Sequence, residues 1–204
     1  MITTERAASL PGRAVYAPLV PRRGYRHVLI ADGEGAQALI TLLTCAAEGI
    51  SLAPVEILYT PGPDGVDQSA ELATISAETL HRDATPDALL QRLQQILREA
   101  CMGIQFYVAG SEALIGQVER DIMATGYPGE AIQKEHRGST RRRVRCVHCK
   151  GITDNVAVEP VRCTHCGLHL RVRDQYSPRL AAFMGVCVDA EEPGSIPSAV
   201  VRFL

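Results

Sequence analysis

The segment YRHVLIADGEG, residues 25–35, indicates the fold class of this chain. It begins with a short apolar strand, and a turn with two glycines follows at 32–35. Apolar residues then recur at helical spacing over 39–46, and Gly49 stands where the end of a helix favours glycine. A buried strand that leads through a glycine turn into a helix is typical of the first unit of a parallel α/β sheet.

The same alternation continues as far as residue 136. Further strands are predicted at 55–59 and 104–109, with a weak third strand near Ala73-Thr74-Ile75. Thr85-Pro86 and Ser111 have the features of helix N-caps. We therefore predict a small doubly wound parallel sheet over 25–136, preceded by an irregular lead-in at 1–24 that is rich in Pro and Gly.

Composition narrows the class of protein. The formal net charge is −2, so the total charge predicts no general affinity for polyanions. No apolar run approaches the ~20 residues that span a bilayer, and the first thirteen residues lack the apolar core of a secretory signal. We expect a cytoplasmic protein with reduced cysteines and no membrane contact. No nucleophile, base and orienting group occur in a recognisable pattern, so no catalytic residue is assigned.

Two C-x-x-C pairs predict a metal site in the C-terminal third. Cys146 and Cys149 form the first pair, Cys163 and Cys166 form the second, and thirteen residues separate them. Four thiolates at tetrahedral corners suit zinc or iron. Zinc is favoured, because rubredoxin-like iron sites usually have Pro and Gly in both turns and the first turn here has neither. The alternatives are two disulfides or four unligated thiols, which this spacing and a cytoplasmic context disfavour.

Residues 137–204 are predicted to form a zinc-ribbon domain with a C-terminal tail. The segment 151–162 suits a hairpin between the two pairs. His148 and His165 lie within the pairs, and each could replace a cysteine as a metal ligand, but both are expected to point to solvent. A basic run over 137–150 leaves nucleic-acid binding open as an alternative. No aromatic residues are interleaved for base stacking, so a solvated linker or a patch for an acidic protein partner is the preferred interpretation.

The α/β part resembles the nicotinamide-binding module of ferredoxin reductases. Ala109-Gly110-Ser111 stands where that family has Cys-Gly-Pro after its last strand, and Gly126-Tyr127-Pro128 matches its tail. The opening unit, 27–49, is similar to the first strand, turn and helix of the module. The resemblance implies NADPH-binding positions at Asp32, Gly33, Gly35, Gly110 and Ser111. Two departures predict weakened or lost binding: Asp32 and Glu34 bring negative charge to the phosphate turn, and Ala109 replaces the cysteine.

The tail 168–191, together with the cysteine pairs, resembles the A subunit family of bacterial dimethylamine monooxygenase. That resemblance implies one polypeptide of a multisubunit oxidase, which demethylates dimethylamine with O₂ and NADPH. It also implies that haem, flavin, iron–sulfur and folate groups reside on partner subunits. The mixed apolar and charged tail suggests a partner-facing surface with anchors at Arg173, Tyr176, Arg179 and Phe183. An auxiliary subunit is the leading hypothesis, and the NAD(P)H-binding half of a split reductase is the alternative.

Overall fold

The α/β part is built on one parallel sheet, here called sheet A. The structure, a computed structural model, describes residues 16–47, 50–52, 54–74 and 79–203. Sheet A has the strand order β3-β2-β1-β4-β5. Because the order reverses between β1 and β4, the carboxyl ends of these two strands form the switch point where open α/β sheets have their crevice. The strands are β1 (Arg26–Asp32), β2 (Val55–Thr60), β3 (Thr79–Arg82), β4 (Ile104–Gly110) and β5 (Ile132–His136).

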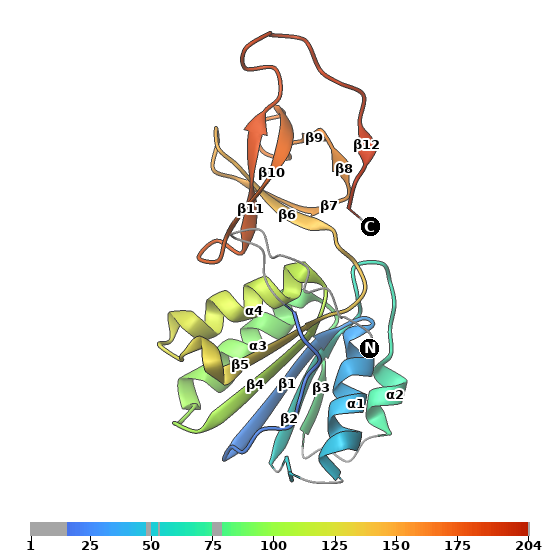
Figure 1. Ribbon diagram of the computed structural model, residues 1–204, viewed down its shortest axis with the longest axis vertical. Helices are drawn as coiled ribbons and strands as arrows, with labels where there is room; N and C mark the ends of the chain where they lie inside the picture. The colour runs from blue at the N-terminus through green and yellow to red at the C-terminus, as the bar shows by residue number, and fades with distance from the viewer. Residues whose placement is uncertain (1–15, 48–49, 53, 75–78, 204) are drawn as a thin grey trace, which may run out of the picture.

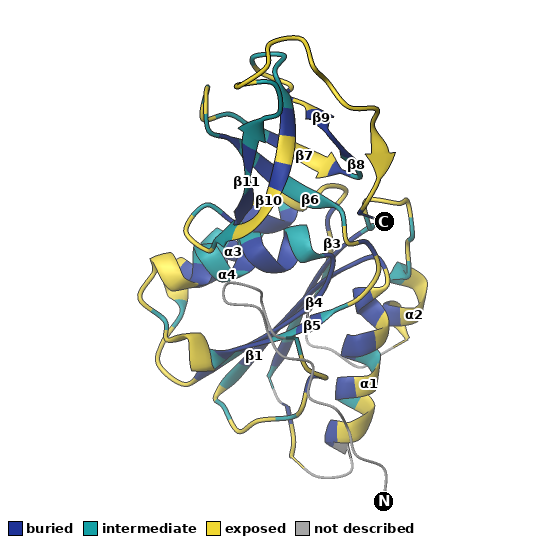
Figure 2. Ribbon diagram, turned by 45° about the horizontal axis from the view of Figure 1, so that its top comes forward, coloured by how far each residue is buried: buried dark blue, intermediate teal, exposed yellow. Residues whose placement is uncertain are grey.

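Helices cover both faces of sheet A (Figure 1). One face packs against α3 and α4 around a core that includes Val28, Phe106 and Leu93, and the other packs against α1 around Leu29, Ile57 and Leu39. The central strands are buried almost throughout, as expected for parallel strands with two covered faces (Figure 2). This confirms the predicted doubly wound sheet. The helices are α1 (Gly35–Ala47), α2 (Ser69–Ala73), α3 (Pro86–Glu99) and α4 (Glu112–Ala124), with a 3₁₀ turn at Gly129–Ala131.

The predicted third strand lies elsewhere. Ala73 ends α2 and Thr74 is its C-cap, whereas β3 begins at Thr79; Ile75 lies outside the described residues. Asp67 accepts a hydrogen bond from the Ser69 amide at 3.0 Å just before the helix, and Leu72 is its buried contact. A short helix with a single apolar anchor gives no periodic signal, so the apolar residues in this region were wrongly interpreted as a strand.

The lead-in docks along the edge strand β5 over residues 17–22. The Leu19 amide donates to the Glu135 carboxylate at 2.8 Å, and the Gln133 side-chain amide exchanges two hydrogen bonds with the backbone of Val20. The Arg22 amide donates to the Tyr107 hydroxyl at 3.0 Å. Side chains of β5 therefore form hydrogen bonds with the lead-in backbone in place of those of a sixth strand, and the β5 edge of sheet A is covered.

The C-terminal part is a separate five-stranded sheet, here called sheet B, with the order β7-β6-β11-β10-β9. Strands β6 and β11 are parallel, while the other neighbours are antiparallel. Sheet B lies beyond the carboxyl ends of the sheet A strands (Figure 1). Its strands are β6 (Arg142–Cys146), β7 (Ile152–Val156), β9 (Val161–Arg162), β10 (His169–Ser177) and β11 (Ala182–Cys187); β8 (Val158–Glu159) pairs with β12 (Val200–Val201).

An arginine stacked between two aromatic rings closes the inner face of sheet B. The Arg142 guanidinium carbon lies 4.0 Å from the Phe183 ring centroid and 4.3 Å from that of Phe203. Asp174 accepts a hydrogen bond from the same guanidinium at 2.9 Å. Cation–π contacts and a carboxylate thus hold the last described residue of the chain against the start of β6.

Tyr176 of β10 joins the two parts of the chain by packing against α4. A Cβ atom at Gly116 would lie 2.1 Å from the Tyr176 hydroxyl oxygen, so the ring fits only because residue 116 has no side chain. Burial raises the pKa of Tyr176 to about 12, which keeps this hydroxyl neutral.

We predict that the effect of Gly116→Ala on the free energy of unfolding depends on the residue at position 176. In the wild-type background the added methyl group overpacks the contact and should lower the free energy of unfolding by about 1–3 kcal/mol. In a Tyr176→Phe background the hydroxyl is gone, so the same change should be neutral or stabilising by up to about 1 kcal/mol, because alanine favours a helix over glycine. Chemical denaturation of the four proteins measures the coupling. Equal effects of Gly116→Ala in both backgrounds would contradict this contact between the Tyr176 hydroxyl and residue 116.

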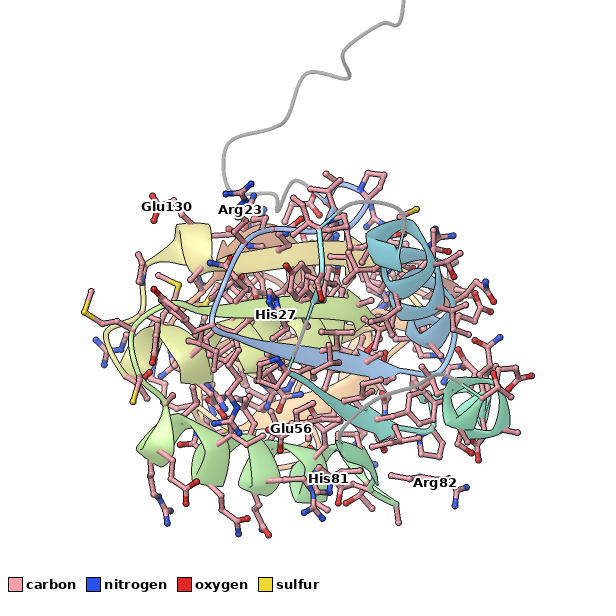
Figure 3. The ribbon with its side chains drawn as sticks, turned by 90° about the horizontal axis from the view of Figure 1, so that it is seen from below. Arg23, His27, Glu56, His81, Arg82 and Glu130 are labelled. Atoms are coloured by element: carbon pink, nitrogen blue, oxygen red, sulfur yellow. The ribbon has the colours of Figure 1, made fainter. Side chains whose placement is uncertain are left out.

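His27 is a buried histidine at the amino end of sheet A. Figure 3, seen from the side opposite sheet B, shows it near the middle of the sheet, away from Glu56 and His81, which form an ion pair at 3.3 Å. The His27 side chain is fully buried, and neither ring nitrogen has a hydrogen-bond partner among the described residues. Burial therefore lowers the pKa of His27, because the charged ring cannot be solvated.

We predict that His27→Leu weakens the loss of stability in mild acid. The unfolded chain takes up a proton near the ordinary histidine pKa of about 6.5, whereas the folded chain does so only at lower pH. The contribution of His27 is thus full above that value and is lost as pH falls, by up to about 1.4 kcal/mol per pH unit. Urea denaturation at several pH values should show a shallower decline in the variant. A decline of the same slope in both proteins would contradict the assignment.

Candidate functional site

The four cysteines of the two C-x-x-C pairs converge on one point. Their sulfur atoms all lie within 4.8 Å of one another. The Cys146 and Cys166 sulfurs are 3.8 Å apart, and those of Cys149 and Cys163 are 3.7 Å apart. A tetrahedron with metal–sulfur bonds of about 2.3 Å has edges of about 3.8 Å. A disulfide needs about 2.05 Å, so the arrangement fits a bound metal ion and not two disulfides.

The two turns that hold the cysteines have the same backbone geometry. The Cys146 amide donates to the Gly151 carbonyl at 2.9 Å, and the Cys163 amide donates to the Leu168 carbonyl at 2.8 Å. The residue after each pair is left-handed, with φ of +66° at Lys150 and +77° at Gly167. This conformation aims the next amide back at the pair, and the Gly151 amide lies 3.4 Å from the Cys149 sulfur. Such amide–sulfur contacts stabilise thiolate charge.

The thiols do not ionise together in the absence of a cation. Burial of Cys163 opposes its ionisation, but the amides of Cys166 and His165 and the neighbouring thiols outweigh it and lower the Cys163 pKa to about 6. The Leu168 amide favours the Cys166 thiolate, yet burial and the other three cysteines raise the Cys166 pKa to about 12. One thiolate thus disfavours a second at this separation, and a divalent cation would remove the conflict.

The neighbouring histidines lie outside the sulfur cluster. The His165 ring packs over Gly151, and its Nε2 lies 2.9 Å from the Ile152 carbonyl oxygen. His148 is exposed. Four sulfur atoms around one ion would fill all tetrahedral positions and leave no place for water or substrate. Such an arrangement is that of a structural centre.

The second candidate site is the crevice between β1 and β4, and a carboxylate occupies it. Asp32 is buried at the end of β1. Its Oδ1 accepts from the Ser111 amide at 2.7 Å and its Oδ2 accepts from the Ser111 hydroxyl at 2.5 Å. Ser111 is the N-cap of α4 and also accepts from the Leu114 amide at 3.2 Å. Asp32 therefore binds the helix terminus that a phosphate would need.

The glycines of the crevice are explained by contacts within the chain. A Cβ at Gly110, where φ is +130°, would lie 1.9 Å from Asp32 Oδ1. One at Gly35 would lie 2.3 Å from the Ala109 carbonyl oxygen, so α1 packs directly on β4. Gly33, with φ of +44°, lies against Gly62 in the same way. These positions let chain segments approach each other, and that need alone accounts for glycine at each of them.

A cleft of about 410 Å³ lies between the crevice and sheet B. It is bordered by Asp32, Ser111, Arg141 and Arg143 among others. Both arginines already have acidic partners, with Arg141 3.0 Å from Asp64 and Arg143 2.6 Å from Asp154. Burial raises the pKa of Asp32, although hydrogen bonds from Ser111 oppose the shift. The charged groups of the cleft are thus paired within the chain, although the buried Arg141 Nε has no hydrogen-bond partner among the described residues. With a buried carboxylate at the α4 terminus, the residues present do not fit a pyrophosphate.

The predicted interface residues divide into two groups. Phe183 is buried in the core of sheet B, and Tyr176 packs on α4 and lies 5.1 Å from the Phe183 ring. These two side chains are engaged within the chain. Arg173 and Arg179 are exposed. Sequence inspection missed the role of Arg142, whose stacking partners lie 41 and 61 positions further along the chain.

Comparisons with known proteins identify relatives of both parts. Residues 8–132 match the N-terminal domain, and residues 143–186 the C-terminal domain, of the family described as dimethylamine monooxygenase subunit DmmA-like. A protein of Ectopseudomonas mendocina (strain ymp), named heme-dependent oxidative N-demethylase delta subunit, is 31% identical over 155 residues, which cover 74% of this chain and 86% of that protein. None of the helices in the described part of the chain has the length and hydrophobicity needed to span a bilayer.

Solved structures with similar α/β parts include two reductase-type proteins. Phthalate dioxygenase reductase is 19% identical, with a TM-score of 0.46 over 71% of this chain and 48% of that chain. The flavohem-like FAD/NAD-binding domain of nitric oxide dioxygenase from Vibrio cholerae O1 biovar El Tor is also 19% identical, with a TM-score of 0.40 over 62% and 56% of the two chains. This chain therefore spans about half the length of each.

We predict that replacing one metal ligand unfolds sheet B. Cys163→Ser should lower bound metal from about one equivalent to near zero, because a hydroxyl is a poor substitute for thiolate at a soft site. Metal binding supplies up to about 10 kcal/mol of folding energy to such modules, so residues 142–203 should also become protease-sensitive. Elemental analysis and limited proteolysis measure the two effects. Cys101→Ser, at an exposed thiol, is the matched control. Full metal content in both variants would exclude this site.

Proposed function

Because this chain belongs to the dimethylamine monooxygenase subunit DmmA-like family, we propose that it is one subunit of an enzyme that oxidatively N-demethylates dimethylamine. The named relative is a delta subunit, which supports an assembly with several partner chains. In this proposal O₂ and NADPH are consumed by the whole enzyme, and the haem, flavin, iron–sulfur and folate groups are held by the partners.

The proposed role of this subunit is structural, or auxiliary to electron transfer. The observation that carries it is the pair of hydrogen bonds between Asp32 and Ser111, at 2.7 and 2.5 Å. They occupy the N-terminus of α4 at the switch point, beside the turn that leads from β1 into α1, which is the region where a fold of this topology binds a dinucleotide phosphate. A chain that uses its own carboxylate there has no need of NADPH to complete its fold.

The alternative is that the chain supplies the nucleotide half of a split reductase. The strand order of sheet A favours this alternative. Against it, an incoming phosphate would have to displace the buried Asp32 carboxylate and compete with Asp64 and Asp154 for the two arginines. The two roles differ in a simple property, which is the affinity of the isolated chain for NADPH.

We further propose that the four cysteines bind zinc. The closed, all-sulfur tetrahedron and the rigid turns suit an ion without redox chemistry or a geometric preference of its own. Iron in the same site is the alternative, and a red colour with visible absorption would identify it.

We predict that NADPH does not bind the isolated chain at concentrations up to about 1 mM, which corresponds to a binding free energy weaker than about −4 kcal/mol. Calorimetric titration measures this for the wild type and for Asp32→Asn, with Glu34→Gln as the control for a charge on the exposed part of the same turn. If the crevice is closed as proposed, only Asp32→Asn gains measurable affinity for pyrophosphate or NADPH. Micromolar binding by the wild type would establish the split-reductase alternative instead.

The proposed structural or auxiliary role can also be tested in the assembled enzyme. Reconstitution without this chain should reduce amine-dependent O₂ consumption, while NADPH still reduces the flavin of the remaining subunits. Loss of flavin reduction on omission of this chain would contradict an auxiliary role.

A further inference from the structure

Charge is segregated between the two parts of this chain. Residues 1–136 hold ten Arg and Lys against seventeen Asp and Glu, whereas residues 137–204 hold eleven against six. The formal charges are therefore −7 and +5, and the near-neutral total conceals them. Charge separated on this scale creates a field that orients partners before contact.

The register of sheet B sorts its basic side chains onto one face. Arg162 pairs with His169, Arg171 pairs with Val186, and Met184 pairs with Arg145. Paired residues point to the same side of a sheet, and the alternate set, which includes Leu170, Val172 and Cys146, fills the inner core. The outer face of sheet B thus presents Arg145, Arg162, Arg171 and Arg173 around Met184 and Val186.

These four arginines differ from most other arginines of the domain; the exposed Arg179, between β10 and β11, is likewise outside the salt bridges of the described residues. Arg137, Arg141, Arg142, Arg143 and Arg202 each have a carboxylate partner within the chain. Among the described residues, none of the salt bridges involves the four arginines of the outer face. Arg162, Arg171 and Arg173 are exposed, and β10 alternates between buried and exposed residues along its first half (Figure 2).

Two acidic residues on or next to sheet B have partners of their own. Asp154 lies on β7 and is paired with Arg143 at 2.6 Å. Asp189 follows β11 and accepts hydrogen bonds from the Cys187 thiol and the Gly194 amide. Strands in a sheet are about 4.8 Å apart, so the arginines from β9 to β6 span about 14 Å across three strand intervals. An apolar centre ringed by unpaired arginines is the composition of a protein–protein interface.

We propose that the outer face of sheet B, centred on Met184 and Val186 and ringed by Arg145, Arg162, Arg171 and Arg173, docks an acidic surface of a partner subunit. The inference rests on the proposed function, because it takes the partner from the same oxidase. It relocates the interface predicted from the tail: Arg173 belongs to it, whereas Tyr176 and Phe183 pack on the inner side. Nucleic acid is a poorer fit, since the outer-face positions of the paired strands include His169 but no Phe, Tyr or Trp for base stacking.

The test is a pair of matched double charge reversals. Arg171→Glu/Arg173→Glu reverses the outer face, and Arg23→Glu/Arg98→Glu reverses two exposed arginines of the α/β part. Both change the net charge equally. Each tagged chain is co-expressed with the other subunits of its own oxidase, and the affinity of the purified chain for the remaining complex is measured from low to high salt. Metal content and thermal unfolding establish that both variants are folded.

The expected result is an affinity about tenfold or more weaker for the outer-face variant near physiological salt, with a smaller difference as salt screens the wild type. The control variant should bind like the wild type. If the wild type does not join the complex at all, the proposed function fails. If the wild type and both variants bind equally, the function stands and the docking face is wrong.

Two further outcomes would overturn the choice of occupant. Binding of the wild type to a DNA or RNA duplex in the same salt, lost in the outer-face variant, would assign the face to nucleic acid. Self-association of the isolated wild-type chain, lost in the same variant, would assign it to the acidic α/β part of a second copy. Analytical ultracentrifugation and a fluorescence binding assay distinguish these outcomes from partner docking.

Discussion

The convergence of four sulfur atoms on one point is the constraint from which the C-terminal half of the molecule follows. Cys146 ends β6 and Cys163 follows β9, so the sulfur cluster brings together two strands that are three intervals apart in the sheet. The Val147 amide then donates to the Gly185 carbonyl at 3.0 Å, which continues the β6–β11 pairing into the first turn. Because a strand register has a period of two, fixing it also decides which residues face outward. The basic outer face is thus a consequence of where the cysteines lie.

The α/β part has a different kind of constraint, in which the chain satisfies its own polar groups. Asp32 caps α4 through Ser111, and β5 side chains bond the lead-in through Glu135 and Gln133. A fold of this topology usually leaves its crevice open for a ligand. Here a buried carboxylate takes that place. The N-terminus of α4 therefore has its capping partner within the chain.

Local sequence patterns predicted the elements whose cause is local. The strands β1, β2 and β4 are short apolar runs, and the caps at Thr85 and Ser111 are made by the residues that the pattern indicated. The convergence of the four cysteines was also predictable, since each C-x-x-C pair lies on one turn. The prediction for the third strand was wrong because Leu72 is the lone buried residue of a short helix.

Features that depend on contacts between distant residues could not be predicted from local sequence patterns. Nothing local links Asp32 to a serine 79 positions away, or pairs β6 in parallel with β11. The sidedness of the tail, in contrast, follows from the local two-residue alternation of a strand. Arg171 and Arg173 lie on one face of β10, whereas Val172 and Tyr176 lie on the other. The register against β11 shifts by two residues between Val172, which pairs with Gly185, and Tyr176, which pairs with Phe183, and a shift of two keeps Tyr176 on the inner face. An interpretation of the tail as one continuous surface therefore joins residues that point to opposite sides. Tyr176 faces the α/β part, and the two arginines before it are exposed.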